Sequence, residues 1–98
     1  MAFSIRIRPE AEKDLQEAFD YYQECRSGLG HEFMMCVDVA LKSIQRNPTQ
    51  YPITYKQIYR NFVQRFPFGV YYLVKQDLVL VIAVLHVRRN PLHWQKRV

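Results

Sequence analysis

Leu78-Val79-Leu80-Val81-Ile82-Ala83-Val84-Leu85-His86 is the stretch that decides the fold of this 98-residue chain. It opens with 8 consecutive apolar residues, far fewer than the ~20 that a membrane-spanning helix needs and typical of a buried β-strand. Because a strand that is apolar on both faces must be covered on both sides, we expect it to lie inside a sheet. The pattern predicts this strand from Leu78 to Arg88.

Two shorter strands precede the long one and complete an antiparallel unit. The pattern predicts one strand from Tyr59 to Phe66, ended by Pro67, and another from Gly69 to Lys75. Gln76 and Asp77 then form a short turn into the long strand. Residues 48–58, which include two prolines, are expected to form a loop.

The first half of the chain predicts one strand and two helices. Apolar residues alternate with polar ones over residues 3–7, which indicates a half-buried strand. Apolar residues at helical spacing then predict a helix from Pro9 to about Arg26 and a second helix that ends at Asn47. The break between them, residues 27–30, is short enough to make an antiparallel helical hairpin.

The element order β-α-α-β-β-β predicts an α+β fold, in which the helical hairpin packs on one face of a small, mainly antiparallel sheet. Glu10, Asp14 and Glu17 follow one another at helical spacing in the first helix, and we expect them to form a solvated face. The second face of the sheet is then open or covered by another segment. We expect a function to reside there.

Composition is that of an ordinary globular domain. Hydrophobic residues make up 49% and charged residues 23% of the chain, which excludes a disordered or collagen-like protein. The length suits a single domain over residues 1–98. The first residues lack the apolar core of a signal peptide, so we expect a cytoplasmic protein without a membrane segment. No motif predicts a cofactor, and the histidines and cysteines are too scattered to predict a metal site.

The two halves of the chain differ in charge. Residues 1–50 carry 6 basic and 8 acidic side chains, whereas residues 51–98 carry 8 basic and 1 acidic side chain. The formal net charge of the whole chain is +5. A basic half of this kind suits a polyanion or an acidic protein as partner.

Seven residues of the basic half form the candidate site: Arg60, Arg65, His86, Arg88, Arg89, Trp94 and Arg97. His86 and Arg88 are two residues apart near the end of the long strand, so their side chains are expected to share one face. The arginines could hold phosphates through paired hydrogen bonds, and Trp94 could stack on a base or anchor a protein contact. The alternative is a solvated basic rim, with Trp94 closing the edge of the core.

Motifs along nearly the whole sequence point to one family. They are Glu12-x-Asp14-Leu15, Tyr21-Tyr22, Leu29-Gly30-x-x-Phe33, Ile44-x-x-x-Pro48-x-x-Tyr51-Pro52, Arg65-Phe66-Pro67-Phe68-x-Val70-x-Tyr72-x-Val74 and His86-x-Arg88-Arg89-x-Pro91-x-x-Trp94-x-x-Arg97. With them the chain resembles toxins of the ParE/RelE superfamily of bacterial type II toxin–antitoxin modules. The resemblance implies a chain that arrests growth unless a cognate antitoxin covers it with an acidic C-terminal segment.

The resemblance leaves two activities to distinguish. RelE-like toxins cleave messenger RNA on the ribosome with a cluster of basic residues, for which Arg65, His86 and Arg88 are the candidates here. Trp94, however, stands about where that branch has a tyrosine, and an indole cannot transfer a proton as a phenol does. ParE-like toxins inhibit DNA gyrase without such a cluster, and the segment from His86 to Arg97 resembles that branch.

We therefore predict a gyrase inhibitor, a binding protein and not an enzyme, whose contact residues are the seven of the candidate site. It would meet DNA only indirectly, through gyrase or through its antitoxin. The alternative is a ribosome-dependent endoribonuclease that acts on messenger RNA. A further alternative is an inactive copy of a toxin, which serves only in antitoxin binding and in regulation of its own operon.

Overall fold

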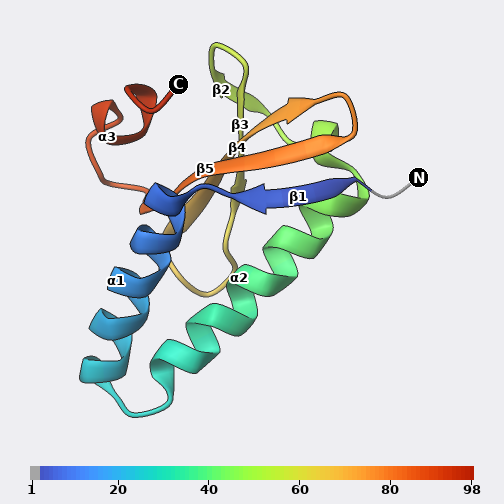
Figure 1. Ribbon diagram of the computed structural model, residues 1–98. Helices are drawn as coiled ribbons and strands as arrows, with labels where there is room; N and C mark the ends of the chain where they lie inside the picture. The colour runs from blue at the N-terminus through green and yellow to red at the C-terminus, as the bar shows by residue number, and fades with distance from the viewer. Residues whose placement is uncertain (1–2) are drawn as a thin grey trace.

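A computed structural model describes residues 3–98, and Met1 and Ala2 of the predicted domain lie outside the described residues. Helices and strands follow in the order β1 (Ser4–Ile7), α1 (Pro9–Cys25), α2 (Leu29–Arg46), the 3-10 helix η1 (Pro48–Gln50), β2 (Ile53–Tyr55), β3 (Ile58–Phe62), β4 (Phe68–Lys75), β5 (Leu78–His86) and α3 (Leu92–Gln95). The predicted α+β class is confirmed, because α1 and α2 form a hairpin against a mostly antiparallel sheet (Figure 1).

The sheet has five strands in the order β1-β5-β4-β3-β2. β1 pairs with β5 in parallel, whereas all other neighbours are antiparallel. β5 therefore lies inside the sheet, as its apolar sequence predicted. A bulge in the β4–β5 ladder, where Tyr71 pairs with Ala83 but Tyr72 pairs with Val81, leaves Ile82 without an opposite residue.

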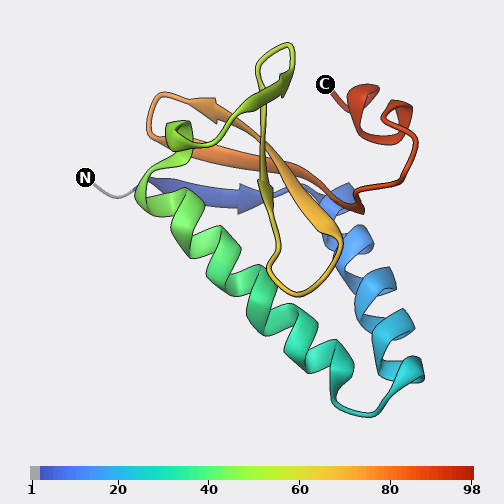
Figure 2. The ribbon, with the colours of Figure 1, turned by 180° about the vertical axis from the view of Figure 1, so that it is seen from behind.

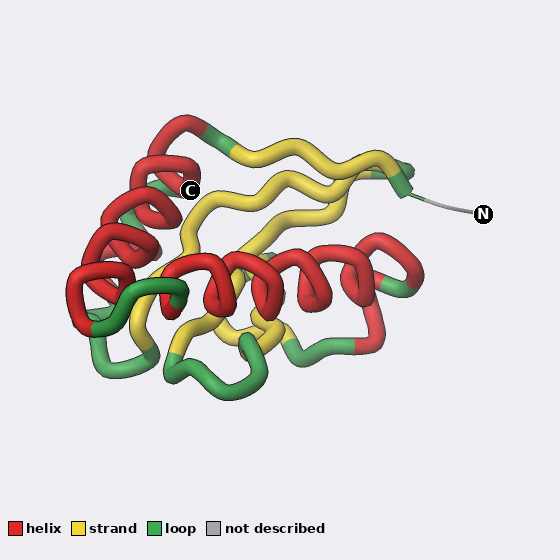
Figure 3. The backbone as a smooth tube through the Cα atoms, turned by 90° about the horizontal axis from the view of Figure 1, so that it is seen from below, coloured by secondary structure: helices red, strands yellow, loops and turns green. Residues whose placement is uncertain are grey.

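The helical hairpin depends on two glycines in the predicted break. Gly28 adopts a left-handed conformation with φ of 91°, which costs a residue without a Cβ little. Gly30 lies inside the first turn of α2, where an added Cβ would come within 2.7 Å of the Phe19 carbonyl oxygen of α1. The two helices diverge from this close crossing beneath the sheet, as Figure 3 shows from below.

The larger core fills the space between the hairpin and the sheet. Its fully buried side chains include Phe33, Val37 and Ile44 of α2 and Val79 and Val81 of β5. Apolar burial of this kind contributes about 25 cal/mol per Å². The core therefore fixes α2 on the sheet and, with it, every side chain that α2 presents to the outside.

A second, smaller core covers part of the opposite sheet face. Trp94 of α3 packs there with Tyr71, Ile82 and Leu85. The face that we expected to be either open or covered by another segment is thus partly covered by α3. Figures 1 and 2 show that α3 returns beside the start of α1.

Three predicted boundaries are wrong. β3 ends at Phe62 instead of Phe66, because Arg65 adopts a left-handed φ of 71° in the turn towards β4. β5 ends at His86 instead of Arg88. The predicted loop over residues 48–58 contains η1 and the short strand β2, which pairs with β3. Within residues 3–98, no helix is both long enough and apolar enough to cross a membrane.

Candidate functional site

Four of the seven candidate residues, Arg65, His86, Arg88 and Arg89, lie where β5 ends and in the turn between β3 and β4. The two segments touch, since the Val87 backbone N–H donates a hydrogen bond of 2.9 Å to the Pro67 carbonyl oxygen. His86 is the last residue of β5, and Arg88 and Arg89 follow in an exposed turn. This end of the molecule therefore presents basic side chains from two separate stretches of the sequence.

His86 is held by the turn that follows it. Its Nδ1 accepts a hydrogen bond of 3.1 Å from the Arg88 backbone N–H, and its carbonyl oxygen accepts one of 2.9 Å from the Arg89 N–H. The imidazole also packs edge-on against Phe68, with ring centroids 5.6 Å apart. The prediction that His86 and Arg88 share one strand face is wrong, because the chain leaves the strand at His86.

Arg65 reaches towards α2. Its guanidinium donates a hydrogen bond of 2.9 Å to Glu32, which also accepts one of 3.2 Å from Arg26. The hydrogen bond from Arg65, followed by that from Arg26, lowers the pKa of the Glu32 carboxyl, and the same bond raises the pKa of Arg65. Because 61% of the Arg65 side chain is exposed, this pair contributes little to stability and can exchange partners.

Trp94 lies in the interior. It is only 4% exposed and stacks on Tyr71 with ring centroids 4.5 Å apart. The position agrees with the alternative reading, in which Trp94 closes the edge of the core. As a contact residue it would have to leave the second core, so its predicted anchoring role does not fit its position here.

Arg97 is also engaged internally, with Asp14. The guanidinium donates two hydrogen bonds to the carboxylate, at 2.6 and 3.2 Å, and a third of 3.1 Å to the Ile82 carbonyl oxygen. Asp14 accepts a further bond from the Val84 N–H at 3.1 Å. The prediction that Asp14 belongs to a solvated face is wrong, because its side chain is buried against β5.

Asp14 was the residue that sequence reasoning missed, although its position carried a signal. It follows Ala11 by three residues and precedes Leu15 and Ala18, and these four are the buried positions of α1. This is the spacing of one helix face. An acidic residue on that face predicts an internal basic partner, since a buried carboxylate without a partner is costly.

The side chain of Arg60, in β3, packs beside Gly69 of β4. A Cβ at Gly69 would lie 3.2 Å from Arg60 Cδ, and the guanidinium stacks 4.6 Å from the centroid of the Phe62 ring. Its Nε is buried and, within residues 3–98, has no hydrogen-bond partner. Arg60 therefore has an open donor beside the second face of the sheet.

The seven residues thus divide into two groups. Arg65, Trp94 and Arg97 make internal contacts, whereas His86, Arg88, Arg89 and Arg60 keep polar groups for a partner. Two of the three candidates for acid–base cleavage of a phosphodiester have separate partners, since Arg65 binds Glu32 and His86 accepts the Arg88 backbone N–H. Among the described residues, no group of three or more metal-ligating side chains comes together.

Comparison with known proteins identifies a family for this chain. The family model for the ParE toxin of the type II toxin–antitoxin system parDE matches residues 5–91. Toxin ParE2 of Mycobacterium tuberculosis is 26% identical over 92 residues, which cover 93% of this chain and 88% of that protein.

Solved structures share the fold. The chromosomal ParDE system from P. aeruginosa superposes with a TM-score of 0.79 at 18% identity, over 89% of this chain and 98% of that chain. The toxin–antitoxin complex RelBE2 from Mycobacterium tuberculosis gives a TM-score of 0.60 at 14% identity, over 88% and 99% of the two chains. From the match of the family model over residues 5–91, the chain belongs to the ParE toxin family of type II toxin–antitoxin systems.

Proposed function

We propose that this toxin acts as a single domain in the cytoplasm and arrests growth by binding DNA gyrase, and that a cognate antitoxin neutralises it. The observation that supports this proposal is the exposed basic turn after β5. There, Arg88 and Arg89 have no internal ion pair among the described residues. Arginine is the residue best suited to protein and phosphate contacts of this kind. DNA would then be reached only through the gyrase complex or through the antitoxin.

The arrangement around His86 supports binding over acid–base catalysis. A general base must be free to take a proton from its substrate, yet His86 Nδ1 already accepts the Arg88 N–H. Arg65, the second catalytic candidate, donates a hydrogen bond to Glu32 of α2. Trp94 is buried and supplies no proton-transfer group.

The test is a supercoiling and cleavage assay with purified gyrase, plasmid DNA and antitoxin-free toxin. We expect loss of supercoiling and accumulation of linear plasmid. The Arg88→Ala, Arg89→Ala double variant should lose at least about 10-fold in potency, the effect of removing contacts worth about 1.4 kcal/mol. Lys13→Ala, an exposed basic residue on α1, is the matched control and should retain full potency.

Two results would change the assignment. Cleavage of messenger RNA on translating ribosomes that His86→Gln abolishes, without effect on gyrase, would favour the endoribonuclease. Folded toxin that binds its antitoxin but affects neither gyrase nor ribosomes would favour the inactive copy, which acts only in operon regulation.

A further inference from the structure

Arg97 ties the C-terminal end of the chain to α1 and to β5. Its guanidinium donates hydrogen bonds of 2.6 and 3.2 Å to the Asp14 carboxylate and one of 3.1 Å to the Ile82 carbonyl oxygen. Its own carbonyl oxygen accepts a hydrogen bond of 2.7 Å from the Arg8 guanidinium. Asp14 is held from a further side by the Val84 backbone N–H, at 3.1 Å. Arg97 and the groups that it binds form a C-terminal latch, which joins the two ends of the sequence.

The basic turn proposed to bind the target lies between the sheet and this latch. β5 ends at His86 and α3 begins at Leu92, and the connection between them, residues 87–91, is exposed throughout. At its start, the Arg88 and Arg89 backbone N–H groups donate hydrogen bonds to His86. At its other end the turn runs directly into α3. The course of the turn therefore depends on where α3 is held.

α3 cannot keep its position by itself. It has four residues, whereas isolated helices shorter than about 12–15 residues are at best marginally stable in water. Trp94 anchors one side of α3 in the second core, where it stacks on Tyr71. Arg97 follows three residues later and anchors the end of the segment. The far end of the basic turn is thus positioned by Trp94 and the latch together.

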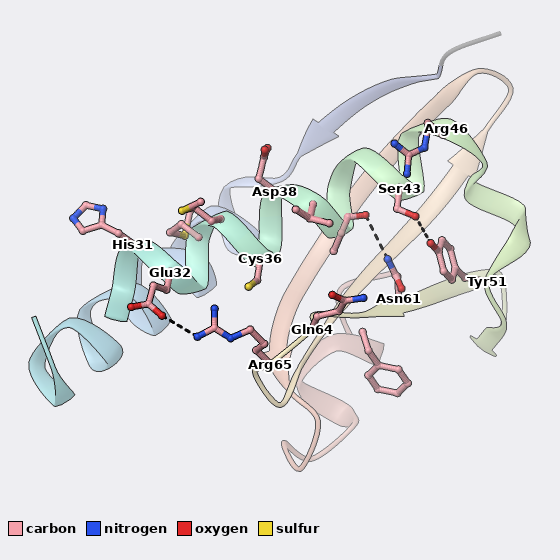
Figure 4. A pocket seen from close by; sticks show the side chains of 15 residues that line it. His31, Glu32, Cys36, Asp38, Ser43, Arg46, Tyr51, Asn61, Gln64 and Arg65 are labelled. Carbon is pink, nitrogen blue, oxygen red and sulfur yellow. Dashed lines mark hydrogen bonds and ion pairs between the residues drawn. The ribbon is translucent and has the colours of Figure 1, made fainter. Parts of the chain in front are cut away.

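The latch contributes direction as well as stability. An apolar pair of similar size often stabilises a fold as much as a buried ion pair does. A guanidinium fork, however, binds its carboxylate in one planar orientation, which apolar side chains do not impose. The bond from Arg97 to the Ile82 carbonyl oxygen adds a third fixed point, on the strand from which the turn starts. The exposed pair of Arg65 and Glu32 lacks this property, because a single hydrogen bond joins them (Figure 4).

We propose that Asp14 and Arg97 are positioning residues, which fix α3 and so hold the turn of Arg88 and Arg89 in the conformation that binds the target. The inference rests on the proposed function, in which this turn contacts gyrase. A turn that is already ordered loses less conformational freedom on binding. The latch would therefore raise the affinity for gyrase without touching it.

Two latch variants test the proposal. Arg97→Lys keeps the positive charge but lacks the planar fork. The double variant Asp14→Leu with Arg97→Met removes both charges, so that none is left buried without a partner. In each, trypsin should cleave the turn after Arg88 and Arg89 faster than in the wild type. The toxin concentration for half-inhibition of gyrase should rise by about 10-fold or more, the loss expected if the turn adopts its binding conformation only about a tenth of the time.

Two controls separate positioning from stability. Glu17→Gln removes an exposed carboxylate from α1 and should match the wild type in every assay. Ile44→Val removes a methylene from the larger core, where Ile44 is fully buried, and should lower the urea midpoint. Because Ile44 lies in α2, this variant should keep the wild-type cleavage rate in the turn and the wild-type potency against gyrase.

The outcomes also separate this inference from the proposed function. Wild-type potency and wild-type cleavage of the double variant would overturn the positioning role and leave gyrase as the target. Potency that falls with the urea midpoint in Arg97→Lys and Ile44→Val alike would overturn it too, since stability alone would explain the loss. If the wild type does not inhibit gyrase, the target is rejected and tryptic cleavage decides the latch. Faster cleavage of both latch variants would then support the ordering of the turn, and an unchanged rate would reject it.

Discussion

The ion pair between Asp14 and Arg97 is the contact whose removal should most clearly change stability. The side chains are 6% and 19% exposed, respectively, and share two hydrogen bonds. Removing one partner of a buried pair costs about 3–5 kcal/mol, because the other charge is left without compensation. We expect Asp14→Asn to cost about 3 kcal/mol, the lower end of that range, because water still reaches part of Arg97.

Urea denaturation followed by circular dichroism measures this loss as a lower midpoint at unchanged slope. In a thermal scan the same loss corresponds to a fall of about 12–24 °C for a domain of this size. Glu17→Gln, which removes an exposed carboxylate from the same helix, is the control and should change stability by less than about 0.5 kcal/mol.

A double variant checks the reasoning independently. Replacing both partners with apolar residues, Asp14→Leu with Arg97→Met, leaves no unpaired charge and should be more stable than Asp14→Leu alone. If Asp14→Asn matches the wild type within about 0.5 kcal/mol, or if the double variant is the less stable of the two, the pair is not the internal contact described above.

Three further predictions concern other buried or paired side chains. Trp94→Ala should destabilise the fold by about 3–5 kcal/mol in urea, because it empties the second core, and an unchanged midpoint would place Trp94 at the surface after all. Tyr72→Phe should cost about 1–2 kcal/mol, since the Tyr72 hydroxyl donates a hydrogen bond of 2.6 Å to the Pro48 carbonyl oxygen. Burial also raises the pKa of Tyr72 above its usual 10.0, so its contribution should persist below pH 10 and fall as the pH rises beyond it, an effect that Tyr72→Phe should remove. The pKa of Glu32 should lie below 4.5 in an NMR titration of its carboxyl and return towards that value in Arg65→Ala, because the bond from Arg65 is the main cause of the shift. The small stabilisation from that pair is present above the unfolded pKa and is lost as the pH falls through the folded one.

The sequence predicted the elements whose apolar pattern is regular. β5 is apolar throughout, α1 and α2 carry clear helical stripes, and the turn at Gln76 and Asp77 joins β4 to β5 as expected. These patterns indicate which residues of an element are buried, and the buried residues determine how the element packs in the fold. The architecture could therefore be predicted from local information.

What the sequence did not predict depends on long-range contacts. β2 is only three residues long and forms because β3 offers it an edge. Asp14 is buried because Arg97, 83 residues away in the sequence, reaches it. Met35 and Val39 of α2 likewise lie near Asn61, Gln64 and Arg65 only because the turn after β3 folds beside the helix, so the sequence did not distinguish them from ordinary surface residues.

The parallel pairing of β1 with β5 has a consequence for synthesis on the ribosome. Ser4 pairs with Leu78, so the first strand to emerge waits for a partner that is translated about 4–15 s later at typical elongation rates. Closing so long a loop is entropically costly and slow, whereas the α1–α2 hairpin needs only neighbouring residues. The nascent toxin should thus form its helical hairpin well before β5 and the basic turn that follows it are complete. A newly made toxin therefore passes through a period in which its helical hairpin has formed but its proposed target-binding turn does not yet exist.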